Sequence, residues 1–222
     1  MTDATTLSAA LTDVRHAYRV VADYQRRCLD MLILIGQQFP ETRFYNWKTS
    51  NGTAATPPAR VDPRTFWGWN FLPLHQISLL LVQNGGGGSF PAVGDWLVEV
   101  RIITDSGFDI PDTRIEPNTA DFTSVEASES MMSIMIFKCA EQVPDGHNWF
   151  HHVWGGASWP ADIADPDDDG LVYLEDGSLV SCQMDVPLEQ MTSKEAVKEF
   201  CSRAKRLFSA KLNIEFEGTV AR

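Results

Sequence analysis

Residues 95–104 read DWLVEVRIIT, and this stretch decides the fold class of the chain. Its apolar residues alternate with Glu99 and Arg101, a period of two that is typical of a β-strand with one buried face. Further strands are expected at 75–83, 131–140, 171–174 and 179–184, the last two joined by the hairpin signal Asp176-Gly177. No helical pattern separates these strands, and strands in series favour an antiparallel sheet.

Two amphipathic helices are expected on either side of the strands. The first covers residues 6–39, where apolar residues recur every three or four positions until Pro40 ends the pattern. Its stripe consists of Leu11, Val14, Tyr18, Val21, Cys28, Leu32, Ile35 and Phe39, with Gln25 as the interruption. The second covers residues 193–212, with Thr192 and Glu195 as a capping box at its start.

The expected fold class is α+β, a mainly antiparallel sheet with a long N-terminal helix and a C-terminal helix packed on it. The second half of the first helix, Cys28 to Ile35, is apolar almost all round, which predicts deep burial. A length of 222 residues with 44% apolar residues fits one domain. We divide residues 1–222 into the helix at 6–39, an irregular Trp-rich segment at 40–73, the sheet at 74–186 and the helix at 193–212.

Negative charge is concentrated in the middle of the chain. The formal net charge is −12, but residues 91–190 alone carry three Lys or Arg against 20 Asp or Glu, a balance of −17. Nucleic acid is therefore not an expected partner, because phosphate binding needs clustered Lys and Arg. A basic protein partner or a cation suits this acidic region, and so does a role in solubility alone.

The cysteines and the apolar runs indicate a cytoplasmic protein. Cys28, Cys139, Cys182 and Cys201 are scattered and form no CxxC pair, which favours reduced thiols. Asp3 and Asp13 lie where a secretion signal needs basic and apolar residues. The most apolar helical run, Met31 to Ile35, is far shorter than the roughly 18 residues of a membrane span, so no membrane partner is expected.

The acidic stretch 165–176 has the spacing of an EF-hand calcium loop. Asp165, Asp167, Asp169, Gly170 and Asp176 occupy its positions one, three, five, six and twelve. Position twelve is Asp instead of a bidentate Glu, and a hairpin follows where a helix should. Two interpretations remain open, a divalent-cation site and a solvated acidic turn, and no other cofactor is expected.

A second possible metal site involves His147 and His151. Residues four apart share one face of a helix, and Asp162 or Asp165 could supply a third ligand. Asn148 stands where a zinc protease has its catalytic Glu, so the metalloprotease motif is absent. A metal-dependent hydrolase is the first alternative function, although no nucleophile signature supports catalysis and no catalytic residue is named.

The leading hypothesis is a non-enzymatic interaction or regulatory protein. Trp149, Trp154 and Trp159 precede Asp162 and Asp168, and together they would form an acidic, aromatic surface for a basic protein partner. Inhibitor, immunity and antitoxin-like proteins have this requirement. A second alternative is a homodimeric structural protein joined through the N-terminal helix.

Overall fold

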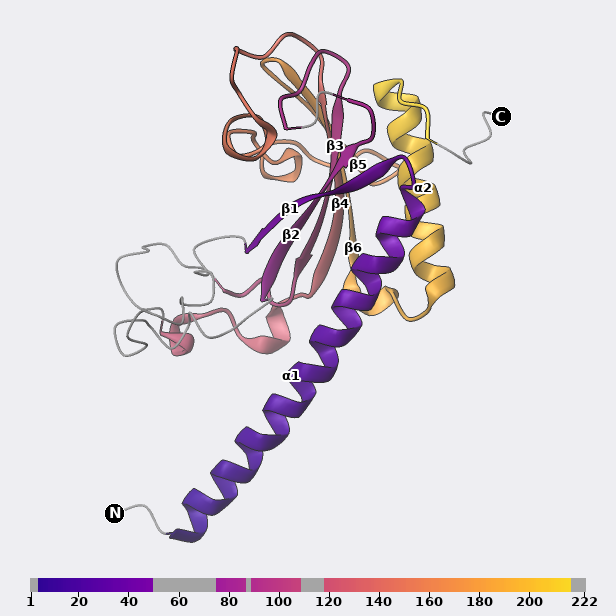
Figure 1. Ribbon diagram of the computed structural model, residues 1–222. Coiled ribbons are helices and arrows are strands. Elements are labelled where there is room, and N and C mark those ends of the chain that lie inside the picture. Colours follow the sequence, from indigo (N-terminus) through magenta and orange to yellow (C-terminus); the bar gives the residue numbers. More distant parts are fainter. Residues whose placement is uncertain (1–3, 50–74, 87–88, 109–117, 217–222) are drawn as a thin grey trace.

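The computed structural model describes residues 4–49, 75–86, 89–108 and 118–216, and it has the expected α+β fold (Figure 1). Six strands form one sheet in the order β1-β2-β3-β4-β6-β5, and all neighbouring strands are antiparallel. The strands are β1 (Thr42–Thr49), β2 (Gln76–Gln83), β3 (Trp96–Ile103), β4 (Met131–Cys139), β5 (Leu171–Asp176) and β6 (Leu179–Pro187). β1 and β5 are therefore the two edge strands.

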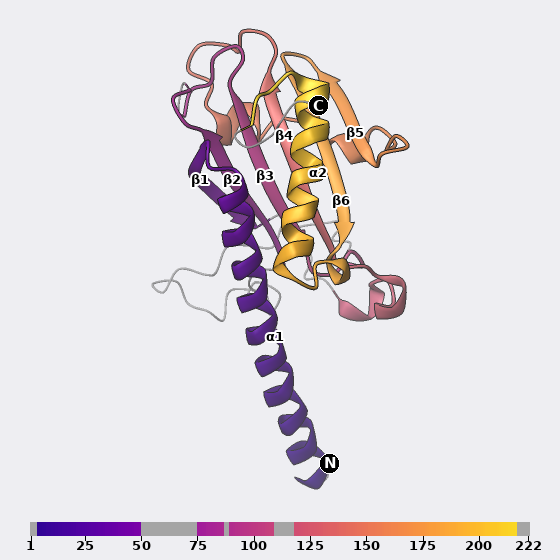
Figure 2. The same cartoon turned by 90° about the vertical axis from the view of Figure 1, so that its right-hand side faces the viewer.

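Two helices, α1 (Ala4–Gln38) and α2 (Lys194–Leu212), cover one face of this sheet (Figures 1 and 2). The alternate residues of β3 from Trp96 to Ile102 point toward them and belong to the larger apolar core. Lys205 Nζ of α2 donates a hydrogen bond to the Gln38 carbonyl at the end of α1, at 2.9 Å. Arg27 of α1 donates to the carbonyl of Met191, just before α2, at 2.8 Å.

The segment that follows β4 covers the opposite face of the sheet. It contains a π-helix at Trp149–Val153 and a 3-10 turn at Pro160–Asp162. Trp149 and Trp154 pack with Leu97 in a second apolar cluster on this face. The sheet is therefore covered on both faces, by the helices on one and by residues 149–163 on the other.

The first half of α1 extends beyond the sheet into solvent (Figure 2). Along the helix, Tyr24 makes the first side-chain contact with the sheet that the structure records, a 3.0 Å hydrogen bond between its hydroxyl and that of Thr104. We call residues 4–23 the arm. At 1.5 Å per residue the arm is about 30 Å long.

The irregular segment predicted at 40–73 is wrong in its first part. Thr42–Thr49 forms β1 and pairs with β2, and its β-branched and aromatic residues are those that strands favour. The sheet therefore begins at Thr42 and not at residue 74. Residues 50–74, which hold the rest of the predicted segment, lie outside the described residues.

Two smaller predictions about the helices are also wrong. Ser193, not Thr192, caps α2, because the Ser193 hydroxyl accepts a hydrogen bond from the Ala196 amide at 3.1 Å. The second half of α1 is not buried all round, since Leu29 and Ile33 are exposed. Leu29 and Ile33 point away from the core. The side of the helix that packs into the core carries Cys28 and Ile35.

Candidate functional site

The three predicted surface tryptophans lie in the segment over the sheet. Trp149 has 0% exposure and Trp154 2%, while Trp159 is half-buried. The side chain of Asn148 fixes the start of the π-helix, because its Oδ1 accepts a hydrogen bond from the His151 amide at 2.8 Å. The protein's own residues thus cover Trp149 and Trp154, and an exposed recognition surface does not include these two side chains.

Beneath these tryptophans lies a buried polar cluster that the alternating pattern of β3 did not predict. Trp154 Nε1 donates a hydrogen bond to Glu99 Oε2 at 2.7 Å, and Glu99 has 0% exposure. The Arg101 guanidinium lies 3.4 Å from the centre of the Trp159 ring, a cation–π contact. The sequence showed only that both side chains lie on the strand face opposite Trp96 and Val98; residues 149–163 enclose them there.

Burial dominates the electrostatics of this cluster. It raises the pKa of Glu99, while hydrogen bonds from Ser78 and Trp154 and the charge of Arg101 act in the opposite direction. Burial likewise lowers the pKa of Arg101, against the favourable charges of Glu99, Asp185 and Asp162. Because Glu99 is fully enclosed, we infer that the cluster has a structural role, which is to hold the 149–163 segment on the sheet.

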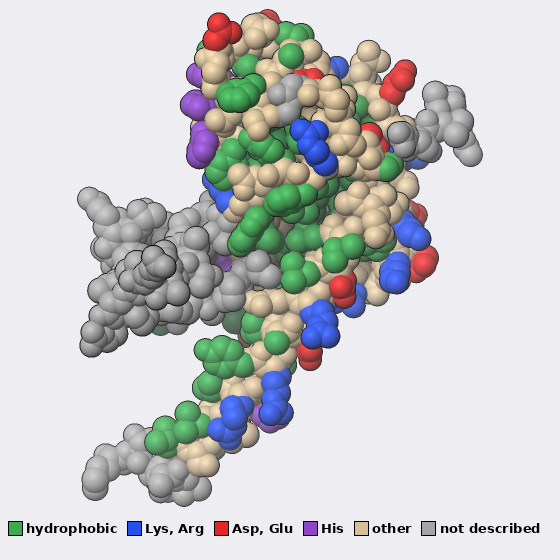
Figure 3. Space-filling model, viewed as in Figure 1, with side chains coloured by type: hydrophobic (Ala, Val, Ile, Leu, Met, Phe, Trp, Pro, Cys, Tyr) green, Lys and Arg blue, Asp and Glu red, His purple; other side chains and the backbone are tan. Residues whose placement is uncertain are grey.

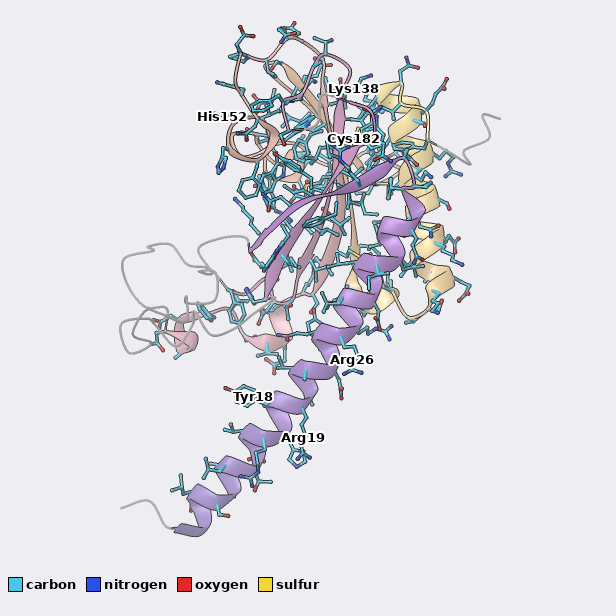
Figure 4. The ribbon with its side chains drawn as sticks, viewed as in Figure 1. Tyr18, Arg19, Arg26, Lys138, His152 and Cys182 are labelled. Atoms are coloured by element: carbon cyan, nitrogen blue, oxygen red, sulfur yellow. The ribbon has the colours of Figure 1, made fainter. Side chains whose placement is uncertain are left out.

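The predicted pair of metal-binding histidines is not brought together. The His147 ring stacks on His152, with ring centres 4.6 Å apart, and not on His151. His152 lies at the surface of this segment (Figure 4). His147 and His152 line a pocket of about 210 Å³ together with Asp176. Within the described residues, no group of three or more His, Cys, Asp or Glu side chains is placed to hold a metal ion.

The predicted calcium-loop aspartates form a turn that leads into β5. Asp167 Oδ1 accepts hydrogen bonds from the amides of Asp169 and Leu171, both at 2.9 Å. Gly170 has φ of 72°, which a residue with a side chain adopts only with strain. Asp176 lies in the β5–β6 hairpin, where its Oδ2 accepts from the Ser158 amide at 3.3 Å. Asp162, Asp165 and Asp168 are exposed and make no shared cluster in this part of the structure.

A different surface stands out on α1. Large apolar side chains are exposed along the helix at Leu7, Leu11, Val14, Tyr18, Val20, Val21, Leu29 and Ile33. Tyr18 is the most exposed of them, at 74%. Of the two that lie beside the sheet, Leu29 and Ile33, Ile33 is the more exposed, at 61%. Figure 3 shows hydrophobic side chains along one side of the arm and basic side chains, all of them arginines, along the other.

Five of these residues and the smaller, exposed Ala22 align in a single row. Leu7, Leu11, Tyr18, Ala22, Leu29 and Ile33 follow one another at spacings of 4, 7, 4, 7 and 4. Steps of four and seven residues are close to whole turns, so these side chains share one side of the helix. We call this row the α1 stripe. Figure 4 shows Tyr18 and Arg19 pointing in different directions from the helix.

The edge strand β1 adds two exposed aromatic residues next to α1. Phe44 is 60% exposed and Trp47 50%. They pair with Leu81 and Leu79 of β2, whose side chains belong to the core under the helices, so they lie on the face of the sheet that α1 covers. The sequence contained a signal for them, because Thr42–Thr49 is rich in strand-forming residues, but Trp47 was assigned to an irregular segment.

Comparison with known proteins places this architecture in a family. A family profile described as PM0109 matches residues 4–213, which include both helices and all six strands. The chain belongs to the PM0109 family. A relative from Pasteurella multocida (strain Pm70), described as uncharacterized protein PM0109, is 26% identical over 217 residues, covering 93% of this chain and 96% of the relative. No solved structure matches the chain.

No helix in the described part is long and apolar enough to span a bilayer. On α1, Arg26 lies beside the stripe, four residues after Ala22, and Arg19 lies about 100° around the helix from Tyr18. Such a helix buries its apolar side against another surface.

Proposed function

We propose that this PM0109-family protein is a non-enzymatic binding protein that engages a protein partner through the α1 stripe. One observation carries the proposal, namely that apolar side chains stay exposed in one row from Leu7 to Ile33, beyond and beside the sheet. Contiguous exposed apolar surface on a water-soluble fold is typical of a protein-binding site. The exposed Phe44 and Trp47 of β1 extend this surface at the sheet end of the helix.

The stripe supports binding better than the acidic, aromatic region does. Trp149 and Trp154 are enclosed, and Asp167 is engaged by two amides. The exposed Asp162, Asp165 and Asp168 still suit a basic region on a partner, which would add to an apolar contact rather than replace it. Inhibitor, immunity and antitoxin-like roles all agree with a binding protein of this kind.

The hydrolase alternative has less support. His147 and His152 share a small pocket with Asp176, whereas His151, whose ring centre lies 6.3 Å from that of His152, does not line it, and no three-ligand group occurs among the described residues. The location we propose is the cytoplasm. All four cysteines are free and buried, which suits a reducing compartment.

Site-specific photo-crosslinking tests the proposed function. A photoreactive amino acid replaces Tyr18 on the stripe or, as the matched control, Arg19, which points about 100° around the helix from Tyr18 on the same turn. In the native host, the probe at position 18 should give a covalent product with a protein identified by mass spectrometry, and the probe at position 19 should give none. Products of equal yield from both positions, or no intermolecular product from position 18, would contradict the proposal.

A further inference from the structure

We infer that the partner on the α1 stripe is the α1 stripe of a second copy of this chain, with the two helices antiparallel. This inference rests on the proposed function and names its partner. A two-fold dimer requires a surface that complements itself. The spacings of the stripe, 4-7-4-7-4, read the same in both directions along the helix. The stripe therefore fits an inverted copy of itself.

The spacing also sets the register. In an antiparallel pair, the residue numbers of facing positions add to a constant, and for this stripe the constant is 40. Leu7 faces the partner's Ile33, Leu11 faces the partner's Leu29, and Tyr18 faces the partner's Ala22. Every residue of the stripe meets an apolar residue, and the largest side chain meets the smallest. The overlap from Leu7 to Ile33 spans about 39 Å.

Exposure next to the sheet supports this register. Leu29 and Ile33 lie where α1 already packs on the sheet, yet they are 46% and 61% exposed. A partner that covered only the arm would leave both in water. An inverted helix of equal length covers them with its own first turns. The second copy thus accounts for the whole stripe.

Charge favours the antiparallel arrangement over the parallel one. Residues 91–190 carry a balance of −17 in each copy. Parallel helices would bring both of these regions to the same end of the pair. Antiparallel helices separate the two Ile33 positions by about 39 Å, several times the Debye length of about 8 Å at physiological salt. Repulsion between the two sheets is then largely screened.

Cysteine crosslinking in the purified full chain tests both partner and register. The native cysteines are all buried, so introduced surface thiols react selectively. Leu7→Cys and Ile33→Cys chains are prepared separately, one of them isotope-labelled, and then mixed and oxidised. The inference expects a disulfide-linked dimer containing one chain of each kind, and none from either variant alone. Leu11→Cys with Leu29→Cys repeats the test in case one substitution weakens folding.

Each other outcome has a definite meaning. Disulfide dimers from the single variants alone would indicate parallel helices and overturn the inference. Native mass spectrometry should show twice the 24.8 kDa chain mass, reduced to the single mass by Tyr18→Lys but not by the control Arg19→Glu. A monomer without any crosslink would overturn self-pairing. If position 18 then crosslinks to a different protein in the host, the proposed function stands alone; if it crosslinks to none, both fail.

Discussion

Replacing Trp154 by Phe tests whether the buried cluster holds the 149–163 segment on the sheet. Phe keeps an aromatic ring at this position but removes the Nε1–H group, which lies 2.7 Å from Glu99 Oε2. Glu99 has 0% exposure, so water does not replace the lost donor. The carboxyl group is then left buried with fewer hydrogen bonds.

The expected cost follows from two contributions. At a pH above the folded-state pKa of Glu99, where the carboxylate is ionised, a hydrogen bond to this buried group contributes about 1.5–3 kcal/mol. The smaller ring also leaves a cavity that costs on the order of 1 kcal/mol. The Trp154→Phe chain should therefore lose about 2.5–4 kcal/mol of unfolding free energy, and for a chain of this size Tm should fall by roughly 5–15 °C.

Urea and thermal unfolding, followed by far-UV circular dichroism, measure this loss. Trp149→Phe is the matched control, because Trp149 is equally buried but its Nε1 has no acceptor among the described residues. It should lose only the cavity contribution of about 1 kcal/mol. In a Glu99→Gln background the acceptor is neutral, so Trp154→Phe should cost about 1 kcal/mol less than in the native chain. Equal losses in the two tryptophan variants, or in the two backgrounds, would refute a structural role for the hydrogen bond.

Three further predictions concern pH, metal and packing. Burial raises the pKa of Glu99, so ionisation of this carboxyl group costs folding free energy. As pH rises above about 4.3, the native chain should lose stability relative to Glu99→Gln, as measured by urea unfolding at a series of pH values. The difference in unfolding free energy between the two chains should become constant above the folded-state pKa of Glu99. Added calcium or a chelator should leave Tm unchanged, whereas Asp167→Ala should lower the unfolding free energy by about 1–2 kcal/mol, since Asp167 Oδ1 serves the Leu171 amide and stabilises a turn; a calcium-dependent rise in Tm would contradict this. Ile35→Ala should cost about 2–5 kcal/mol because Ile35 is fully buried, and Ile33→Ala on the same helix should cost less than about 1 kcal/mol at concentrations where the chain is monomeric, as measured by denaturant titration.

The sequence predicted the main elements because each has a strong local pattern. The alternation in 95–104 became β3, and the stripe ending at Phe39 became α1. β1 was missed although Thr42–Thr49 has strand composition, because a strand at the edge of a sheet is recognised mainly by its pairing. β1 and β2 are separated in the sequence by residues 50–74, so a local sequence pattern does not indicate that the two strands pair.

The interior of the candidate site was harder to predict. Glu99 and Arg101 alternate with apolar residues, and alternation of this kind ordinarily marks the solvent face of a strand. Only the packing of Trp154 and Trp159 over that face shows that it is buried. The exposure of Ile33 was unpredictable for the opposite reason. Ile33 lies in an apolar run, and the sequence of such a run does not indicate which of its residues face solvent.

The packing of α1 against the end of the chain has a consequence for the order of folding. Phe39 meets Phe216 with ring centres 5.9 Å apart, and Lys205 closes the end of α1. During synthesis, α1 emerges before α2 and Phe216, so the part of its apolar side that packs on them has no native cover until they have left the ribosome. Contacts between such distant parts of a sequence also form slowly. A chain that stops before residue 194 therefore leaves Cys28, Ile35 and Phe39 incompletely covered, and we expect such truncated products to aggregate.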